Sequence, residues 1–180
     1  MAEPPSVDGH EITGQGYVSQ RGDGLRRPTR GNRNTMTGKL AAIAKVNELR
    51  APLQELASSN ITVEAGIDGD ARGRKPNRQV TVLFRESWDD ACRELGVDLP
   101  WTTRRANLLV AGVEAPQNVG GKIHIGDVTL EIMLETEPCM LMEQAHAGLK
   151  AALTPNWRGG VCCKVLSGGR IAVGDAVSIR

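Results

Sequence analysis

Short runs in which hydrophobic and polar residues alternate recur along the chain from residue 38 onward. Alternation of this kind, interrupted by turn residues, is typical of β-strands that bury one face. We predict strands at residues 38–46, 60–65, 79–84, 104–110, 128–138, 160–166, 170–173 and 176–180, the fourth beginning as a loop. A glycine pair at 168–169 marks a hairpin turn over 167–170, and residues 52–57 are predicted as loop.

Two segments follow a helical pattern instead. Ser87 is placed to cap a helix over residues 88–95, which Gly96 ends. A second helical stretch covers residues 140–153. Many short strands with only two or three short helices indicate a mostly β, α+β domain built as a closed or partly closed β-barrel.

The first 36 residues differ in composition from the rest. They hold few large apolar side chains and many Gly, Pro, Ser and Arg residues. Such a segment cannot bury enough surface to offset the entropy lost on ordering. We therefore predict a disordered, locally basic tail at residues 1–36 and one folded domain at residues 37–180.

The composition argues against several classes of function. The chain has 180 residues and a formal net charge of +1, so no overall field favours nucleic acid or an acidic membrane. Aromatic residues make up 3%, too few for a base-stacking surface. There is no run of about 18 apolar residues and no secretory signal. We expect a cytoplasmic protein, monomeric or a small homo-oligomer, without a membrane span or a nucleic-acid partner.

The four cysteines, Cys92, Cys139, Cys162 and Cys163, lack the paired C-x-x-C spacing of a structural zinc site. Cys139 is the one placed for chemistry, because it stands between a strand that stops at Pro138 and the helix predicted next. A thiol at a helix N-terminus lies at the positive end of the helix dipole, which favours the thiolate form. A thiolate attacks sulfur or binds a soft metal, so Cys139 is the first candidate.

A basic loop and an arginine pair are candidates to hold an anion. These residues are Arg72, Arg74, Lys75, Arg78, Arg104 and Arg105. Arginine recognises phosphate through two hydrogen bonds at once, which suits a phosphorylated cofactor. Asp70, in the same loop, either contacts a ligand or braces the loop through backbone hydrogen bonds.

Five motifs follow one another along the chain: Gly66–Asp70, Arg105–Asn107, Val119–Gly126, Glu137–Cys139 and Gly159–Asp175. In order and content they resemble the motifs of the MOSC family, named after the C-terminal domain of molybdenum cofactor sulfurases. The resemblance spans about residues 38–180 and implies a mostly β, barrel-like fold.

The resemblance implies one of two uses for the cysteine. Some members bind a molybdopterin cofactor, use the cysteine sulfur as a ligand to molybdenum, and reduce N-hydroxylated compounds with electrons from a redox partner. On this preferred interpretation Cys139 is both the catalytic residue and the molybdenum ligand. The residues expected to bind the cofactor are Arg105, Asn107, Asp70 and Arg72.

Other members were proposed to carry sulfur as a persulfide, received from a pyridoxal-phosphate cysteine desulfurase, for metal–sulfur cluster or cofactor assembly. On this second interpretation the chain is a sulfur carrier whose working form is a Cys139 persulfide and whose partner is the desulfurase. A third interpretation is a domain kept for protein interaction. The sequence leaves open whether the chain is a molybdenum-dependent oxidoreductase or a sulfur-transfer protein.

Overall fold

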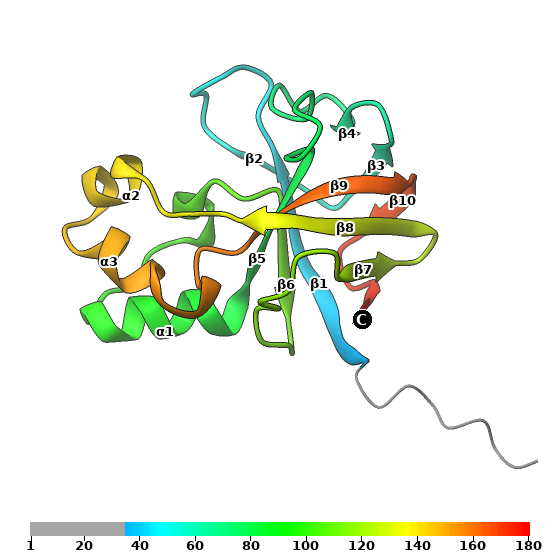
Figure 1. Cartoon of the computed structure of the whole chain (residues 1–180). Helices are drawn as coiled ribbons and strands as arrows, with labels where there is room; N and C mark the ends of the chain where they lie inside the picture. The colour runs from blue at the N-terminus through cyan, green and yellow to red at the C-terminus, as the bar shows by residue number, and fades with distance from the viewer. Residues whose placement is uncertain (1–34) are drawn as a thin grey trace, which may run out of the picture. The chain divides into compact units, whose positions relative to one another are not determined.

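The computed structural model describes residues 35–180, and seven strands of this part close into a barrel (Figure 1). Round the barrel they are β1 (Met36–Lys45), β11 (Ala176–Ile179), β7 (Lys122–Ile125), β8 (Val128–Glu135), β9 (Val161–Ser167), β5 (Val80–Phe84) and β6 (Leu108–Ala111), which pairs with β1 again. Neighbouring strands are antiparallel except β5 and β6. The predicted mostly β barrel is confirmed.

Strand β1 closes the barrel because it is long enough to pair with several others. Its first half pairs with β11, and its middle pairs with β6, with a register shift between Leu40 and Ala42. A bulge of this kind bends a strand and increases its twist, as a closed sheet requires. The end of β1 pairs with β2 (Gln54–Leu56), where the sequence predicted a loop. Pairing with β1 outweighs the weak strand propensity of this segment.

A second, smaller sheet contains β3 (Ser58–Thr62), β4 (Gly66–Ile67) and β10 (Gly169–Ala172). The predicted hairpin at 167–170 is wrong, because β10 pairs with β3 and not with β9. A Cβ atom on Gly168 would lie 2.5 Å from the carbonyl oxygen of Ile61. The glycine therefore allows the chain to pass close to β3 and to change sheets, and it does not form a tight turn.

Helix α1 (Arg85–Leu95) begins directly after β5, three residues earlier than predicted. Its N-cap is Phe84, without a side-chain cap, so Ser87 lies inside the helix. The predicted end is confirmed, since Gly96 adopts a left-handed conformation at φ 67° and closes the last turn. Trp88, Ala91 and Cys92 are buried, so packing of this face fixes the helix without a cap.

The helix predicted over residues 140–153 is two helices, α2 (Met140–Ala145) and α3 (Leu149–Leu153). Gly148, at φ 83°, separates them, and a Cβ atom there would meet the side chain of Leu95 at 3.1 Å. The chain turns at this glycine so that α3 packs against α1. Because α2 has only six residues, the dipole expected behind Cys139 is shorter than the sequence predicted.

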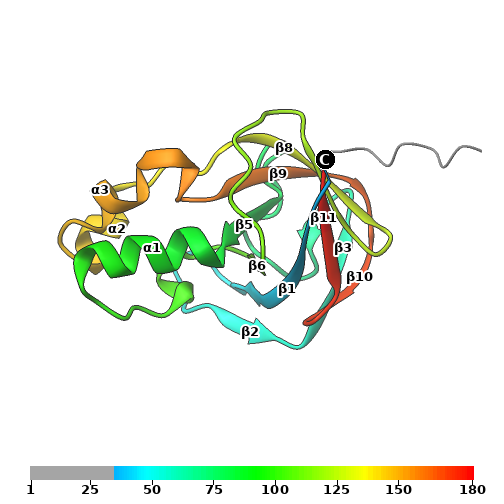
Figure 2. The same ribbon diagram turned by 90° about the horizontal axis from the view of Figure 1, so that it is seen from below.

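Apolar side chains fill the barrel and a second layer beside it. Strand β8 buries Val128, Leu130 and Ile132 in alternation, as predicted. The second layer packs the three helices on the outer side of β5 and β6 through residues such as Leu83 and Leu109. Figure 2 shows the helices together at one side, opposite β10. Strands β5 and β6 are thus covered on both faces, the usual setting of parallel strands.

Most of the predicted tail, residues 1–34, lies outside the described residues. Met36, the last residue assigned to the tail, is already part of β1. Within residues 35–180, no helix has the length and apolar character that crossing a membrane would need.

Candidate functional site

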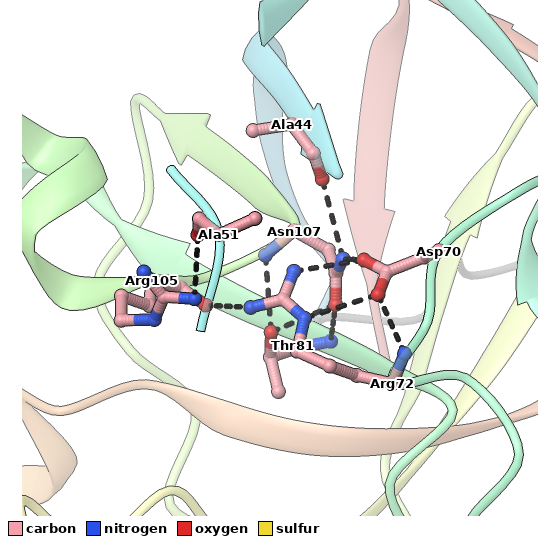
Figure 3. Close-up of polar contacts among 7 residues, drawn as sticks. All are labelled: Ala44, Ala51, Asp70, Arg72, Thr81, Arg105 and Asn107. Atoms are coloured by element: carbon pink, nitrogen blue, oxygen red, sulfur yellow. Dashed lines mark hydrogen bonds and ion pairs between the residues drawn. The ribbon is translucent and has the colours of Figure 1, made fainter. Parts of the chain in front are cut away.

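Asp70 lies at the centre of a buried polar network beside the barrel (Figure 3). The backbone N and the side-chain Nε and Nη2 of Arg72 donate to its carboxylate over 2.8, 3.0 and 2.8 Å, and Nδ2 of Asn107 donates to it as well. Burial alone would raise the pKa of Asp70. The hydrogen bonds and charge of Arg72, with the bond from Asn107, outweigh burial and hold the pKa below its ordinary value.

Asn107 connects three segments of the chain, because both the oxygen and the nitrogen of its side-chain amide make hydrogen bonds. Its Oδ1 accepts from the backbone N and from Oγ1 of Thr81, at 3.1 and 2.9 Å. Its Nδ2 donates to the carbonyl oxygen of Ala44 at 3.2 Å and to Asp70. The side chain therefore ties β1, β5 and the Asp70 loop together.

The network continues to Arg105, which adopts a left-handed conformation at φ 62°. Nη1 of Arg72 donates to its carbonyl oxygen at 2.6 Å, and its own Nη2 donates to the carbonyl oxygen of Ala51 at 3.0 Å. Burial, with the nearby charge of Arg72, lowers the pKa of Arg105, and Asp70 partly offsets this. A non-glycine residue in this conformation costs roughly 1–3 kcal/mol and is frequent at functional sites.

A cavity of about 280 Å³, the cationic cavity, opens over this network. Its lining carries five positive side chains and no carboxylate. The lining residues are Leu49, Ala71, Arg72, Arg74, Lys75, Arg78, Thr81, Arg105 and Asn107. Such a surplus of positive charge suits an anion.

A second cavity of about 130 Å³, the cysteine cavity, contains Cys139. It shares Arg72, Arg78, Thr81 and Arg105 with the cationic cavity, so the two adjoin. The rest of its lining is Val82, Arg104, Ala106, Thr136, Cys139, Leu141, Met142 and Gly159. The thiol and the basic residues, far apart in sequence, thus border two adjoining cavities.

Cys139 is the N-cap residue of α2 and is exposed. Its carbonyl oxygen accepts from the backbone N of Met142 at 2.9 Å, which begins the helix. Met140 and Leu141, which follow it, are also exposed, at 58% and 56%. A partner molecule can therefore reach the sulfur directly.

The other three cysteines are buried. Burial raises the pKa of the Cys92 and Cys163 thiols. Cys162 and Cys163 point to opposite faces of β9, yet both are buried, and Sγ of Cys162 lies 3.1 Å from Oγ1 of Thr136. Cys139 is therefore the exposed thiol of this chain.

Arg104, at the end of the short 3-10 helix η1 (Trp101–Arg104), is buried beside the cysteine cavity. Its Nε donates to the carbonyl oxygen of Gly159 at 2.9 Å and its Nη2 to that of Thr136 at 2.6 Å. Burial, followed by repulsion from Arg78, lowers its pKa to about 10, while the thiols of Cys139 and Cys162 act in the opposite direction. The guanidinium remains charged at neutral pH.

Some contributors to the site were missed from the sequence. Thr81 and Thr136 were not named, and Arg104 was named only as one member of a basic set. No local pattern marks the threonines, because Thr81 acts through Asn107, 26 residues away, and Thr136 through Arg104, 32 residues away. His146, at the end of α2, is not part of the lining of either cavity.

No group of three or more His, Cys, Asp or Glu side chains within residues 35–180 is placed to hold a metal ion. The chemically distinctive groups of the two cavities are one soft sulfur, on Cys139, and several cationic side chains, which suit a soft metal and an anion respectively.

Comparison with known families matches residues 68–178 to the MOSC domain. The matched segment contains Asp70, Arg72, Arg105, Asn107 and Cys139. Comparison with curated proteins gave no match.

Several solved structures share the fold. The YuaD protein from Bacillus subtilis superimposes with a TM-score of 0.67 at 18% identity, over 81% of this chain and 96% of that one. YiiM from Escherichia coli gives 0.59 at 13% identity, over 79% and 69%. YiiM from Geobacillus stearothermophilus gives 0.58 at 14%, over 79% and 73%. At these identities the likeness shows a common fold alone.

Proposed function

The chain belongs to the MOSC domain family, and from this premise we propose that it binds a molybdopterin-type molybdenum cofactor with the Cys139 sulfur as a ligand to the metal. The observation that carries the proposal is that the cavity with the exposed thiol adjoins a cavity lined by arginine and lysine side chains. The thiol fits a soft metal, and the cationic cavity fits the phosphate of the cofactor.

Some of the site residues are proposed to contact the cofactor, and others hold these contacting residues in place. Arg72 and Arg105 line both cavities and are proposed to bind the phosphate. Asp70 and Asn107 keep Arg72 and Arg105 in place through the buried network, and their own hydrogen-bonding groups are already used. When bound, the cofactor supplies a redox-active metal. We propose that the site serves as the terminal component of a reductase of N-hydroxylated compounds, with a separate redox partner.

Metal and pterin content tests this proposal. Protein purified from a host that makes the cofactor should carry about one molybdenum atom per chain, together with fluorescent pterin. Cys139→Ser should lose most of the metal, whereas Cys92→Ala, which removes a buried thiol on α1, should keep it. Wild-type protein that is free of metal and pterin and cannot be loaded would rule the proposal out.

The exposure of Cys139 also supports the sulfur-carrier hypothesis. A thiolate at this position can attack the outer sulfur of a desulfurase persulfide; the sulfur–sulfur bond of the donor breaks, and the donor cysteine leaves as a thiolate. The exposed Met140 and Leu141 leave room for such a partner. Incubation with a desulfurase and cysteine should add the mass of one sulfur atom to Cys139. Sulfur that still appears in Cys139→Ala would contradict this hypothesis.

A further inference from the structure

Arg104 is a buried cation for which the described part of the chain provides no ion-pair partner. Its residue is 6% exposed, and none of the ion pairs within residues 35–180 includes it. Glu135 is close enough to favour its charge but does not reach it. Buried arginines are normally paired, because an isolated charge in a protein interior is costly. Within the described residues, the charge of Arg104 is thus left without a negative partner.

Two carbonyl oxygens fix the direction of this guanidinium. Nε and Nη2 are used by Gly159 and Thr136, at 2.9 and 2.6 Å. Nη1 makes no hydrogen bond to any residue between 35 and 180, and Arg104 borders the cysteine cavity together with Cys139. Arg104 therefore keeps one donor without a partner among residues 35–180, in the lining of the cavity that also contains Cys139.

Arg104 borders the cysteine cavity, whereas the cofactor phosphate is assigned to Arg72 and Arg105, which border both cavities. Arg74 and Lys75 border only the cationic cavity, and Arg104 borders only the cysteine cavity. The cysteine cavity measures about 130 Å³. A space of this size holds several water molecules and is large enough for a carboxylate or a sulfonate.

We propose that the cysteine cavity binds a small oxyanion (a carboxylate, sulfonate or inorganic oxyanion) through Nη1 of Arg104. The molecule on which the Cys139 site acts carries this group. A guanidinium binds such groups through charge-assisted hydrogen bonds, and here the charge is already oriented. The statement that the anion belongs to the substrate rests on the proposed function. The anion site itself is measured on protein without cofactor.

The rates at which iodoacetate and iodoacetamide alkylate Cys139 provide the test. The reagents attack the same thiolate and differ in charge, so the ratio of their rates reports the local field and not the fraction of thiolate. Cys92, Cys162 and Cys163 are buried, so native labelling reports Cys139. In cofactor-free wild-type protein we expect the ratio of the iodoacetate rate to the iodoacetamide rate to be about tenfold above the same ratio for N-acetylcysteine. One charge-assisted hydrogen bond to the carboxylate of iodoacetate would give a difference of this size.

Two matched variants separate a specific site from a general positive field. Arg104→Gln should remove most of the increase in the ratio. Arg74→Gln removes the same charge from the cationic cavity alone and should retain most of it. A wild-type ratio equal to that of N-acetylcysteine overturns the proposal, and so does an equal loss in both variants.

A competition experiment needs no variant at Arg104, in case Arg104→Gln does not fold. Sodium sulfate, added at constant ionic strength, should slow the alkylation of wild-type protein by iodoacetamide until the rate reaches a plateau. No protection would contradict the proposal. If the ratio is raised in protein that never binds molybdenum, the anion site is supported and only cofactor binding is rejected. The experiments therefore distinguish failure of the anion-site proposal from failure of the cofactor proposal.

Discussion

At the scale of single residues, the buried network around Asp70 decides where the basic side chains point. Asp70 holds Arg72, Arg72 holds the carbonyl of Arg105, and Asn107 ties this group to β1 and β5. A buried polar group that loses its partner costs about 1–3 kcal/mol. The network therefore stabilises the fold and shapes the cationic cavity through the same bonds.

Asp70→Asn tests this network through its pH dependence. The pKa of Asp70 is lower in the folded chain than its ordinary value of about 3.9, so its stabilisation is complete above that value and is lost as pH falls through the folded pKa. In urea unfolding, the variant should be less stable by about 1–3 kcal/mol at pH 7. It should also lose less stability than wild type between about pH 5 and pH 2.

The control is Asp89→Asn on the exposed face of α1, which should change stability at pH 7 by less than about 0.5 kcal/mol. If Asp70→Asn follows the wild-type pH curve in parallel, the carboxylate is not held as described.

The sequence identified these residues but not which of them face the cavities and which hold the others in place. The motifs around Asp70, Arg105 and Cys139 were enough to name candidates. The side-chain amide of Asn107 is already used in hydrogen bonds inside the protein. Its partners Ala44 and Thr81 are 63 and 26 residues away in the sequence, so no local pattern reveals these bonds. The lack of a buried counter-ion for Arg104 likewise needs the folded chain.

At the scale of elements, the approach of β9 to the end of β8 brings Arg104 and Cys139 into the lining of one cavity. A Cβ atom on Gly159 would lie 2.4 Å from the carbonyl oxygen of Thr136 and 3.1 Å from Nη2 of Arg104. This glycine therefore sets the distance between the segment that leads to Cys139 and the start of β9.

Gly159→Ala should separate these segments. We expect a loss of about 1–3 kcal/mol in unfolding free energy, because the clash is with backbone, together with a changed alkylation rate of Cys139. Gly126→Ala provides the comparison, since a Cβ atom there meets nothing within 4 Å and only the left-handed conformation is penalised. Unchanged Cys139 reactivity in Gly159→Ala would contradict the role of this contact.

Element boundaries were the least predictable part of the fold. Strands with clear alternation, such as β5, β8 and β11, were found close to their places. The break at Gly148 and the partner of β10 were missed. Both depend on tertiary packing, of α3 against α1 and of β10 against β3, which overrides local propensity.

At the scale of the whole folded unit, closure between β1 and β11 keeps the barrel rigid beneath the site. Ile179 pairs with Met36 of β1 and Ile123 of β7, and its side chain is 1% exposed in the core. A closed sheet has no free edge between these strands, so its strands are expected to unfold together.

Ile179→Ala should therefore destabilise the domain as a unit, by about 2–4 kcal/mol in a single cooperative urea transition. The neighbouring Ser178→Ala, on the other face of β11, should have an effect below about 0.5 kcal/mol. A local opening of β11 that leaves the main transition unchanged would argue against closure as the source of rigidity.

The central claim, that Cys139 is a ligand to molybdenum, is tested most directly by molybdenum K-edge X-ray absorption. The spectra to compare are those of wild-type protein and of the residual molybdenum in Cys139→Ser protein, each purified from a host that makes the cofactor and brought to the same molybdenum concentration. We predict that wild-type protein shows one more sulfur at molybdenum than the variant does. Identical sulfur coordination in the two proteins would contradict the account.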